Sequence, residues 1–228
     1  MAIDAGSLAQ SCTDEQRDSI RDIVLTHAHL DHVAGLPLFI DDLFSSLTSP
    51  IRVHACGEVI EALENHVFNW EIYPRFSELE NEHGSVLEYI ELTNGLEHDV
   101  AGLQLLPIPV NHKVPSSGFL ISDERTTIAF SSDTSVMDVF WDQVNKQERI
   151  DALLIECAFP DALSELADVS HHLTPSKLSG EISKFSHADV PIYAINMKPM
   201  YRETIAAELK RLDISDLEIL EPGRVYEF

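Results

Sequence analysis

The chain has 228 residues, 44% of them hydrophobic, which is enough to form a sizeable buried core. No apolar run approaches the roughly 18 residues that a membrane-spanning helix needs, and three scattered cysteines are too few for a disulfide framework. The 39 acidic and 15 basic residues give a formal net charge of −24. Such a charge disfavours a large nucleic-acid substrate, because phosphate backbones are bound mainly by Lys and Arg.

The first third of the chain is dominated by a histidine-rich segment. Residues 1–8 are typical of the end of a strand and the turn after it, and residues 23–25 form a second apolar run. Residues 26–32, with the sequence Thr-His-Ala-His-Leu-Asp-His, follow directly and are called the His-rich loop below. Residues 33–40 are apolar again. The pattern predicts a strand that ends at the His-rich loop and a helix that begins there.

The His-rich loop contains four residues of the types that bind transition metals. Neutral imidazole and carboxylate suit zinc, manganese or iron. At a strand-to-helix turn, His27 and His29 can face one way while Asp31 and His32 face another. One loop can thus supply ligands to two neighbouring ions, and such an ion pair can clamp both oxygens of a phosphoryl displacement. The alternative is a polar loop that is rich in histidine by chance.

The remainder of the chain alternates strand-like and helix-like segments. Strands are predicted over residues 51–55, 86–92, 103–110, 118–122, 126–130, 152–155, 190–195 and 217–220. Helices are predicted over residues 58–68, 136–144, 175–185 and 202–212, and a polar, aromatic-dotted excursion over residues 69–84. Interleaved strands and helices are typical of layered α/β packing. Because no repeat or low-complexity linker interrupts the chain, we predict a single α/β domain over residues 1–228.

Further residues with ligand or acid–base chemistry follow the predicted strands. Each lies at or just past the C-terminal end of a strand, and they are His27, His112, Asp133, Glu156 and Asn196. Residues at such ends converge on one rim of a sheet, where α/β folds bind their ligands. The order of the segments therefore predicts one composite site.

The pattern His-x-His-x-Asp-His over residues 27–32 resembles the signature of the metallo-β-lactamase superfamily. Its longer form over residues 27–36 resembles the class II cyclic-nucleotide phosphodiesterases. Further segments from residue 2 to about residue 200 resemble that family and occur in the same order along the chain. It implies an αβ/βα sandwich. In that superfamily two or three strands normally precede a segment like residues 3–6. The first strands of the sandwich are absent here, so we expect either a fragment or truncated form, or a sheet closed in another way.

The resemblance also implies a set of metal ligands. His112, after the strand 103–110, matches the third imidazole on the first metal, and Asp133 matches the carboxylate that bridges both metals. The alternative for the segment around Asp133 is a helix N-cap, which Ser132 or Thr134 would serve equally well. The implied ligands are His27, His29, Asp31, His32, His112 and Asp133.

Two later segments resemble the Glu-x-x-Phe and His-x-Thr motifs shared by phosphodiesterases and ribonuclease Z. They begin at Glu156 and His172. The resemblance implies that His172 is the general acid or phosphate contact and that Glu156 orients it. The alternative for His172 is a neighbour of a helix N-cap without chemical function. We assign no role to His171.

Residues 195–199, Ile-Asn-Met-Lys-Pro, resemble the family segment Thr-His-x-Lys-Pro, with one departure. Asn196 stands where the family has a metal-binding histidine, and an amide oxygen is a weaker ligand than imidazole for a transition metal. We therefore expect the second ion to bind more weakly than the first. Lys198 retains the pattern and is expected to approach a phosphate.

We predict that the chain hydrolyses a 3′,5′-cyclic nucleotide, with cyclic AMP as the expected substrate, to the 5′-monophosphate. Two divalent ions are expected as cofactors, zinc first, with manganese or iron as alternatives. Asp31, Glu156 and His172 are the predicted catalytic residues, and His172 and Lys198 the substrate contacts. Two alternatives stay open: a ribonuclease Z-like nuclease, which the acidic charge disfavours, and a metal-binding protein that has lost turnover.

The chain has no charged-then-apolar start of the kind that marks a secretory signal. We expect a cytoplasmic location, or a periplasmic one if a signal lies upstream of these residues. No membrane partner is expected. The sequence does not set the oligomeric state and leaves a homodimer open.

Overall fold

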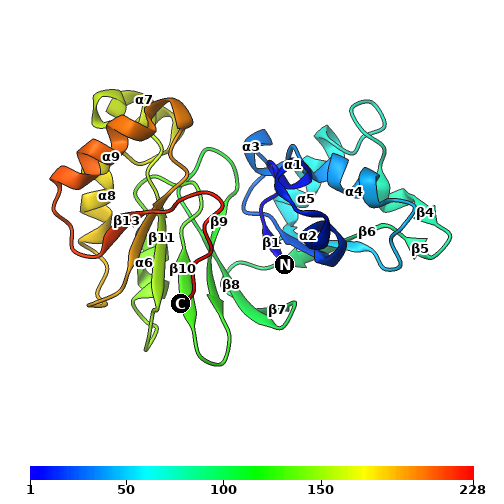
Figure 1. The fold of residues 1–228 in the computed structure, drawn as a ribbon, viewed down its shortest axis with the longest axis horizontal. Helices are drawn as coiled ribbons and strands as arrows, with labels where there is room; N and C mark the ends of the chain where they lie inside the picture. The colour runs from blue at the N-terminus through cyan, green and yellow to red at the C-terminus, as the bar shows by residue number, and fades with distance from the viewer. The chain divides into compact units, whose positions relative to one another are not determined.

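The computed structural model describes residues 1–228, which form two compact units, Met1–Leu96 and Glu97–Phe228 (Figure 1). They are called unit 1 and unit 2 and are described separately. Both combine a β-sheet with helices, so the predicted α/β class is confirmed. The single-domain assignment stays a prediction. None of the helices combines the length and the apolar character that crossing a membrane requires.

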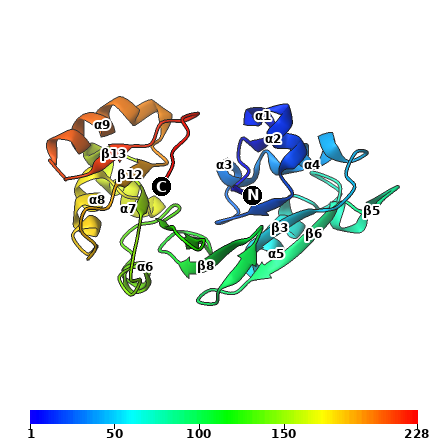
Figure 2. The same ribbon diagram turned by 60° about the horizontal axis from the view of Figure 1, so that its bottom comes forward.

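Unit 1 is built on a four-stranded parallel sheet in the order β1-β2-β3-β6. The strands are β1 (Ala2–Ile3), β2 (Asp22–Val24), β3 (Ile51–Cys56) and β6 (Leu87–Leu92). The helices are α1 (Leu8–Ser11), α2 (Asp14–Ser19), α3 (Leu30–Val33), α4 (Leu36–Leu43) and α5 (Gly57–His66). Helix α5 runs alongside β3 and β6 (Figure 2). The predicted excursion contains the short 3-10 helix η1 (Phe76–Glu78) and a hairpin of β4 (Glu80–Asn81) and β5 (Gly84–Ser85).

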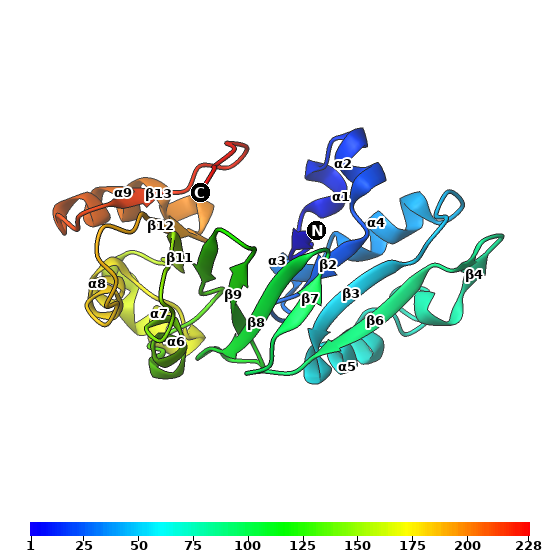
Figure 3. The same ribbon diagram turned by 90° about the horizontal axis from the view of Figure 1, so that it is seen from below.

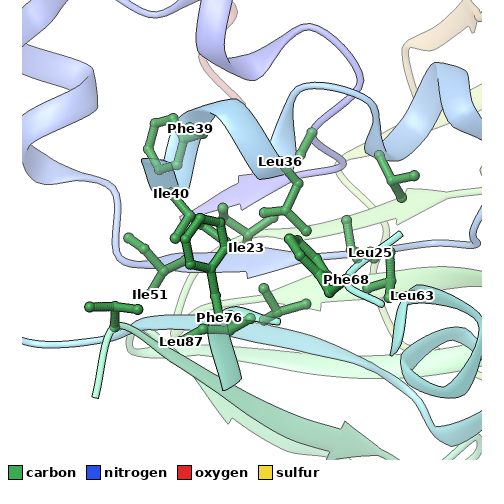
Figure 4. Close-up of a cluster of buried hydrophobic side chains, with 14 of the residues drawn as sticks. Ile23, Leu25, Leu36, Phe39, Ile40, Ile51, Leu63, Phe68, Phe76 and Leu87 are labelled. Carbon is green, nitrogen blue, oxygen red and sulfur yellow. The ribbon is translucent and has the colours of Figure 1, made fainter. Parts of the chain in front are cut away.

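The core of unit 1 lies between one face of this sheet and the helices α4 and α5 (Figure 4). Ile23 and Leu25 belong to this core, whereas Val24 does not, because successive side chains of a strand point to opposite faces. The aromatic side chains of Phe39, Phe68 and Phe76 are fully buried. Burying a side chain of this size contributes about 1.5–3 kcal/mol. The His-rich loop therefore starts from a firmly packed strand.

Unit 2 contains a seven-stranded sheet in the order β13-β12-β11-β10-β9-β8-β7 (Figure 3). Its strands are β7 (His98–Val100), β8 (Leu103–Pro109), β9 (Ser117–Ser122), β10 (Thr127–Phe130), β11 (Ala152–Glu156), β12 (Ile192–Ile195) and β13 (Leu217–Ile219). The helices α6 (Asp138–Val144), α8 (Pro175–Ile182) and α9 (Arg202–Arg211) pack on the sheet through a second buried core. Helix α7 (Ser164–Ser170) and the 3-10 helices η2 (Asp161–Leu163) and η3 (Pro199–Tyr201) complete the unit.

Strand direction in unit 2 brings four chain segments to one edge of the sheet. Strands β10, β11, β12 and β13 are parallel neighbours. Strand β8 is antiparallel to β9, and β9 is antiparallel to β10, so β8 runs in the same direction as β10. The C-terminal ends of β8, β10, β11 and β12 consequently meet at the same edge.

A helix was predicted to begin at the His-rich loop and to continue through the apolar residues 33–40, and its continuity needs correction. The segment forms two helices: α3 begins at Leu30 within the loop, as predicted, and α4 is a separate helix that ends at Leu43. The break lies at Gly35, whose N–H donates to the carbonyl oxygen of Ala5 at 2.9 Å instead of continuing the first helix. A Cβ at position 35 would lie 2.5 Å from that oxygen, so only glycine fits this approach.

Candidate functional site

In unit 1, hydrogen bonds fix how two histidines of the His-rich loop present their rings. The hydroxyl of Thr26 donates to Asp4 Oδ2 at 2.9 Å, so Thr26 Oγ1 accepts from His27 Nδ1, which also lies 2.9 Å away. Asp4 Oδ2 accepts from His32 Nδ1 at 2.6 Å. A neutral imidazole that carries its proton on Nδ1 has its lone pair on Nε2. His27 and His32 are thus held in the tautomer that binds a metal through Nε2.

His29 brings a further ring nitrogen to the same place. Its Nδ1 atom lies 3.1 Å from His27 Nε2, and the two rings meet edge to face. Two nitrogens bound to one zinc ion at 2.0–2.1 Å in tetrahedral geometry are roughly 3.3 Å apart. The donors present in the His-rich loop therefore fit a divalent metal ion. Asp31 lies in the first turn of α3 and is exposed, and its catalytic role stays a prediction.

Asp4 is the residue of unit 1 whose role was not predicted from the sequence. It follows β1 directly, at φ 59°, in the left-handed region where aspartate is enriched among the non-glycine residues. Its carboxylate also accepts from the backbone N–H of Thr26 at 2.8 Å, and its side chain is 15% exposed. A carboxylate behind a metal-binding imidazole fixes the ring and raises its basicity. The sequence could have indicated Asp4 as a candidate, because it is an acidic residue at the C-terminal end of a strand. The other candidates were selected by their position at a strand end.

The turn after β1 touches the backbone of the His-rich loop. Ala5 N–H donates to the carbonyl oxygen of His32 at 2.7 Å. A Cβ on Gly6 would lie 1.7 Å from the carbonyl oxygen of Asp31. This distance is far inside van der Waals contact, and the opposing atom belongs to the backbone, which cannot rotate away.

We expect Gly6→Ala to destabilise the protein by at least the ~1–3 kcal/mol that overpacking usually costs. Urea unfolding of parent and variant measures the difference. Gly180→Ala in α8 is the matched control, because a Cβ there has no atom within 4 Å and alanine favours the helix by roughly 1 kcal/mol. Equal unfolding midpoints for Gly6→Ala and the parent would contradict the close approach.

In unit 2, His112 lies beyond the end of β8, and its ring orientation is also set by a hydrogen bond. His112 Nδ1 is 3.0 Å from the carbonyl oxygen of His171. A carbonyl oxygen only accepts hydrogen bonds, so the proton lies on Nδ1 and the lone pair on Nε2. His112 is thus in the same tautomer as His27 and His32.

Asp133 lies on a buried turn after β10. The preceding residue, Ser132, has φ 57° and is fully buried. Helix α6 begins only at Asp138 with Met137 as its N-cap, so neither Ser132 nor Thr134 caps it. One potential ligand atom of Asp133 lies within 4.8 Å of ligand atoms of His112 and His172. These three side chains of unit 2 can therefore hold a metal ion.

Glu156, the last residue of β11, is fully buried and holds His172. One of its oxygens accepts from His172 Nδ1 at 2.8 Å and from Thr134 N–H at 2.8 Å, and the other accepts from Ala158 N–H at 3.0 Å. Burial raises the pKa of Glu156 to about 7. Burial by itself would lower the pKa of His172, but the hydrogen bond and the charge of Glu156, together with Asp133, raise it. A histidine in this setting can carry and release a proton.

Asn196 and Lys198 follow β12. Asn196 has φ 57°, and its Nδ2 donates to Asp133 Oδ1 at 2.6 Å. The amide thus contacts the predicted bridging carboxylate, while metal binding through its oxygen stays a prediction. The positive charge of Lys198 acts on His172, where it opposes protonation. Within unit 2, hydrogen bonds or short distances connect His112, Asp133, Glu156, His172 and Asn196, and Lys198 acts on His172 through its charge.

Comparison with known proteins identifies relatives over most of the chain. Residues 4–188 match the family model described as the Beta-lactamase superfamily domain. The protein of Yersinia pestis named "Probable 3′,5′-cyclic-nucleotide phosphodiesterase" is 25% identical over 225 residues, which cover 89% of this chain and 63% of the relative. The chain spans between 51% and 63% of the length of the curated relatives it matches.

Solved structures with the same fold show the architecture. Unliganded yeast PDE1 superimposes with a TM-score of 0.76 at 22% identity, over 92% of this chain and 70% of the other. The metallo-β-lactamase fold protein YhfI from Bacillus subtilis gives a TM-score of 0.77 at 15% identity, over 98% and 85% of the two chains. At these identities the likeness concerns the fold alone. The metallo-β-lactamase type predicted from the His-rich loop is thereby confirmed.

Proposed function

Because the chain belongs to the family of β-lactamase superfamily domains, we propose that it is a metal-dependent phosphodiesterase that hydrolyses 3′,5′-cyclic AMP to the 5′-monophosphate. The observation that carries this proposal is the shared tautomer of His27, His32 and His112. Each has its Nδ1 proton held by an oxygen of the protein, which directs Nε2 toward a ligand. Imidazoles arranged in this way are typical of metal ligands.

We propose two divalent metal ions, with zinc as the first choice. The proposed ligands are His27, His29, Asp31, His32, His112, Asp133 and Asn196. Asn196 offers a neutral amide oxygen, so one of the two ions is expected to bind less tightly than the other. When bound, such ions supply an acidified water molecule and positive charge beside the phosphate.

The protein's own residues move the proton and hold the substrate. The attacking water loses a proton to the solvent as its oxygen bonds to phosphorus. As the bond from phosphorus to the 3′ oxygen breaks, His172 donates its own proton to the departing oxygen. Glu156 holds the imidazole by Nδ1 and favours its protonated form, which keeps the acid ready. Lys198 offers a positive charge to the phosphate, and Asp31 stays the third proposed catalytic residue.

Assays on cyclic AMP and on a structured RNA at moderate salt test the proposal. With 39 acidic against 15 basic residues, the surface repels a polyanion, whereas a small anion needs only local positive charge. We therefore expect cyclic AMP to be cleaved faster than RNA by a wide margin, and a chelator to stop the reaction. Faster cleavage of RNA would instead support a ribonuclease Z-like enzyme. Bound metal without turnover of either substrate would support a binding protein.

The similarity to cyclic-nucleotide phosphodiesterases favours a small substrate, since that is the substrate class in the name of the Yersinia pestis relative. The cytoplasmic location and the homodimer stay predictions from the sequence.

A further inference from the structure

Helix α7 ends in a turn that places a histidine where glycine is usual. The residue after the helix, His171, has φ 57° and ψ 60°. The N–H of His172 donates back to the carbonyl oxygen of Ala167 at 2.8 Å, as in a Schellman motif. Glycine is preferred at this position because a side chain is disfavoured in the left-handed region. His171 therefore occupies the position at the expense of backbone strain.

The side chain of His171 makes a defined hydrogen bond. Its Nδ1 lies 2.9 Å from Oδ1 of Asn111, the residue just before His112. The orientation of the Asn111 amide is fixed, because its Nδ2 donates to the carbonyl oxygen of Val136 at 2.9 Å. Oδ1 must then face His171, and His171 Nδ1 must be the donor.

Asn111 is itself anchored through its backbone. Its N–H donates to Thr134 Oγ1 at 3.2 Å, and its carbonyl oxygen accepts from Ser135 N–H at 2.8 Å. His171 therefore bonds to a group that the turn after β10 holds in place. Because the acceptor is fixed, the hydrogen bond can determine the position of the turn that carries the donor, His171.

The main chain of His171 makes the second contact. Its carbonyl oxygen accepts from His112 Nδ1 at 3.0 Å. The next residue, His172, has its ring centroid 5.0 Å from that of His112 and is held separately by Glu156. The turn of His171 and His172 therefore contacts His112 through the carbonyl oxygen of His171 and itself carries the second candidate histidine, His172.

We propose that His171 is a positioning residue for His112, with Asn111 as its partner. The hydrogen bond from His171 to Asn111 locks the turn at the end of α7. The carbonyl oxygen of His171 then keeps the proton of His112 on Nδ1, so that Nε2 is presented to a metal ion. This role rests on the proposed function only in that His112 is taken to bind a metal.

Two variants break the hydrogen bond from opposite ends. Asn111→Ala removes the acceptor, and His171→Gly removes the donor while suiting the left-handed backbone, so this variant is expected to fold. Asn111→Asp retains an acceptor oxygen for His171 but loses the donor to Val136, so it tests whether the acceptor alone restores the hydrogen bond. Ser170→Ala is the matched control on the same helix end, because it loses only an exposed hydrogen bond to the carbonyl oxygen of Leu166.

Nitrogen NMR of the imidazoles in the metal-free protein and calorimetric titration with zinc are the two measurements. In the parent, the Asn111→Asp variant and the Ser170→Ala control, His112 is expected to carry its proton on Nδ1. In Asn111→Ala and His171→Gly, we expect a mixture of tautomers and a roughly 10–100-fold weaker affinity for zinc, the usual loss when the partner of a ligand is removed.

Parent-like tautomer populations and zinc affinity in both Asn111→Ala and His171→Gly would overturn the proposal. A folded protein that turns over no cyclic nucleotide, but whose tautomers and zinc affinity respond as expected, would refute the proposed function and support the positioning role. Because the tautomer is read without metal or substrate, the two failures are distinguishable.

Discussion

Replacement of His29 by alanine is expected to remove bound metal and phosphodiesterase turnover together. His29 Nδ1 faces His27 Nε2 at 3.1 Å, and a metal site that loses one of its nitrogen donors binds its ion far less tightly. The loss of activity should exceed the roughly 10–100-fold that follows from removing a mere partner of a ligand. Elemental analysis after dialysis, combined with the cyclic AMP assay, measures both quantities.

The matched control for this variant is His66→Ala. His66 is the last residue of α5 in the same unit and is exposed, so its loss should change neither metal content nor turnover. If His29→Ala retained the metal content of the parent, His29 would not be a ligand, and the proposed metal core would be wrong.

His172→Ala is expected to lower kcat by about 10²–10⁴-fold, the usual contribution of a general acid, with bound metal retained. Glu156→Gln should cause a smaller decrease, because glutamine keeps an acceptor for His172 Nδ1 but removes the negative charge that favours its protonated form. Steady-state kinetics at saturating metal, with metal content measured on the same samples, provides the comparison.

The result for metal content decides between two roles for His172. Its ligand atom lies within 4.8 Å of those of His112 and Asp133, so it is also placed to bind an ion. Loss of metal together with activity in His172→Ala would make it a ligand and would contradict the general-acid assignment.

Strands proved easier to predict from the sequence than short helices, for a physical reason. Strand β11 is an unbroken apolar run that ends in Glu156, and four of its five residues are buried, so its composition indicates a buried strand. Helix α7 was not predicted, because Leu166 and Val169 are exposed and only Ala167 is buried. A helix without an apolar stripe has no apolar residues at helical spacing, so the sequence pattern does not predict it.

The same distinction applies to the candidate site. The His-rich loop was recognisable because its ligand types are adjacent in the chain. Asp4 was not, because its contact to His32 spans 28 positions and depends on two strand ends lying side by side. His171 was set aside for another reason: it contacts His112 through a carbonyl oxygen, a group that every residue possesses and no sequence pattern reveals.

Four strands of the unit 2 sheet end at one edge, so the residues that form the sheet are distinct from the candidate residues at and beyond the strand ends. The strands are registered by backbone pairs such as Glu156 with Ile195, which do not depend on the side chains in the loops beyond. A substitution at one strand end can therefore alter the donor set and leave the ladder intact. Asn196 lies at such a position, because it follows the last residue of β12 directly. As a proposed ligand, residue 196 is expected to change the preference for a metal ion when it is substituted, while the pairing of the strands stays the same.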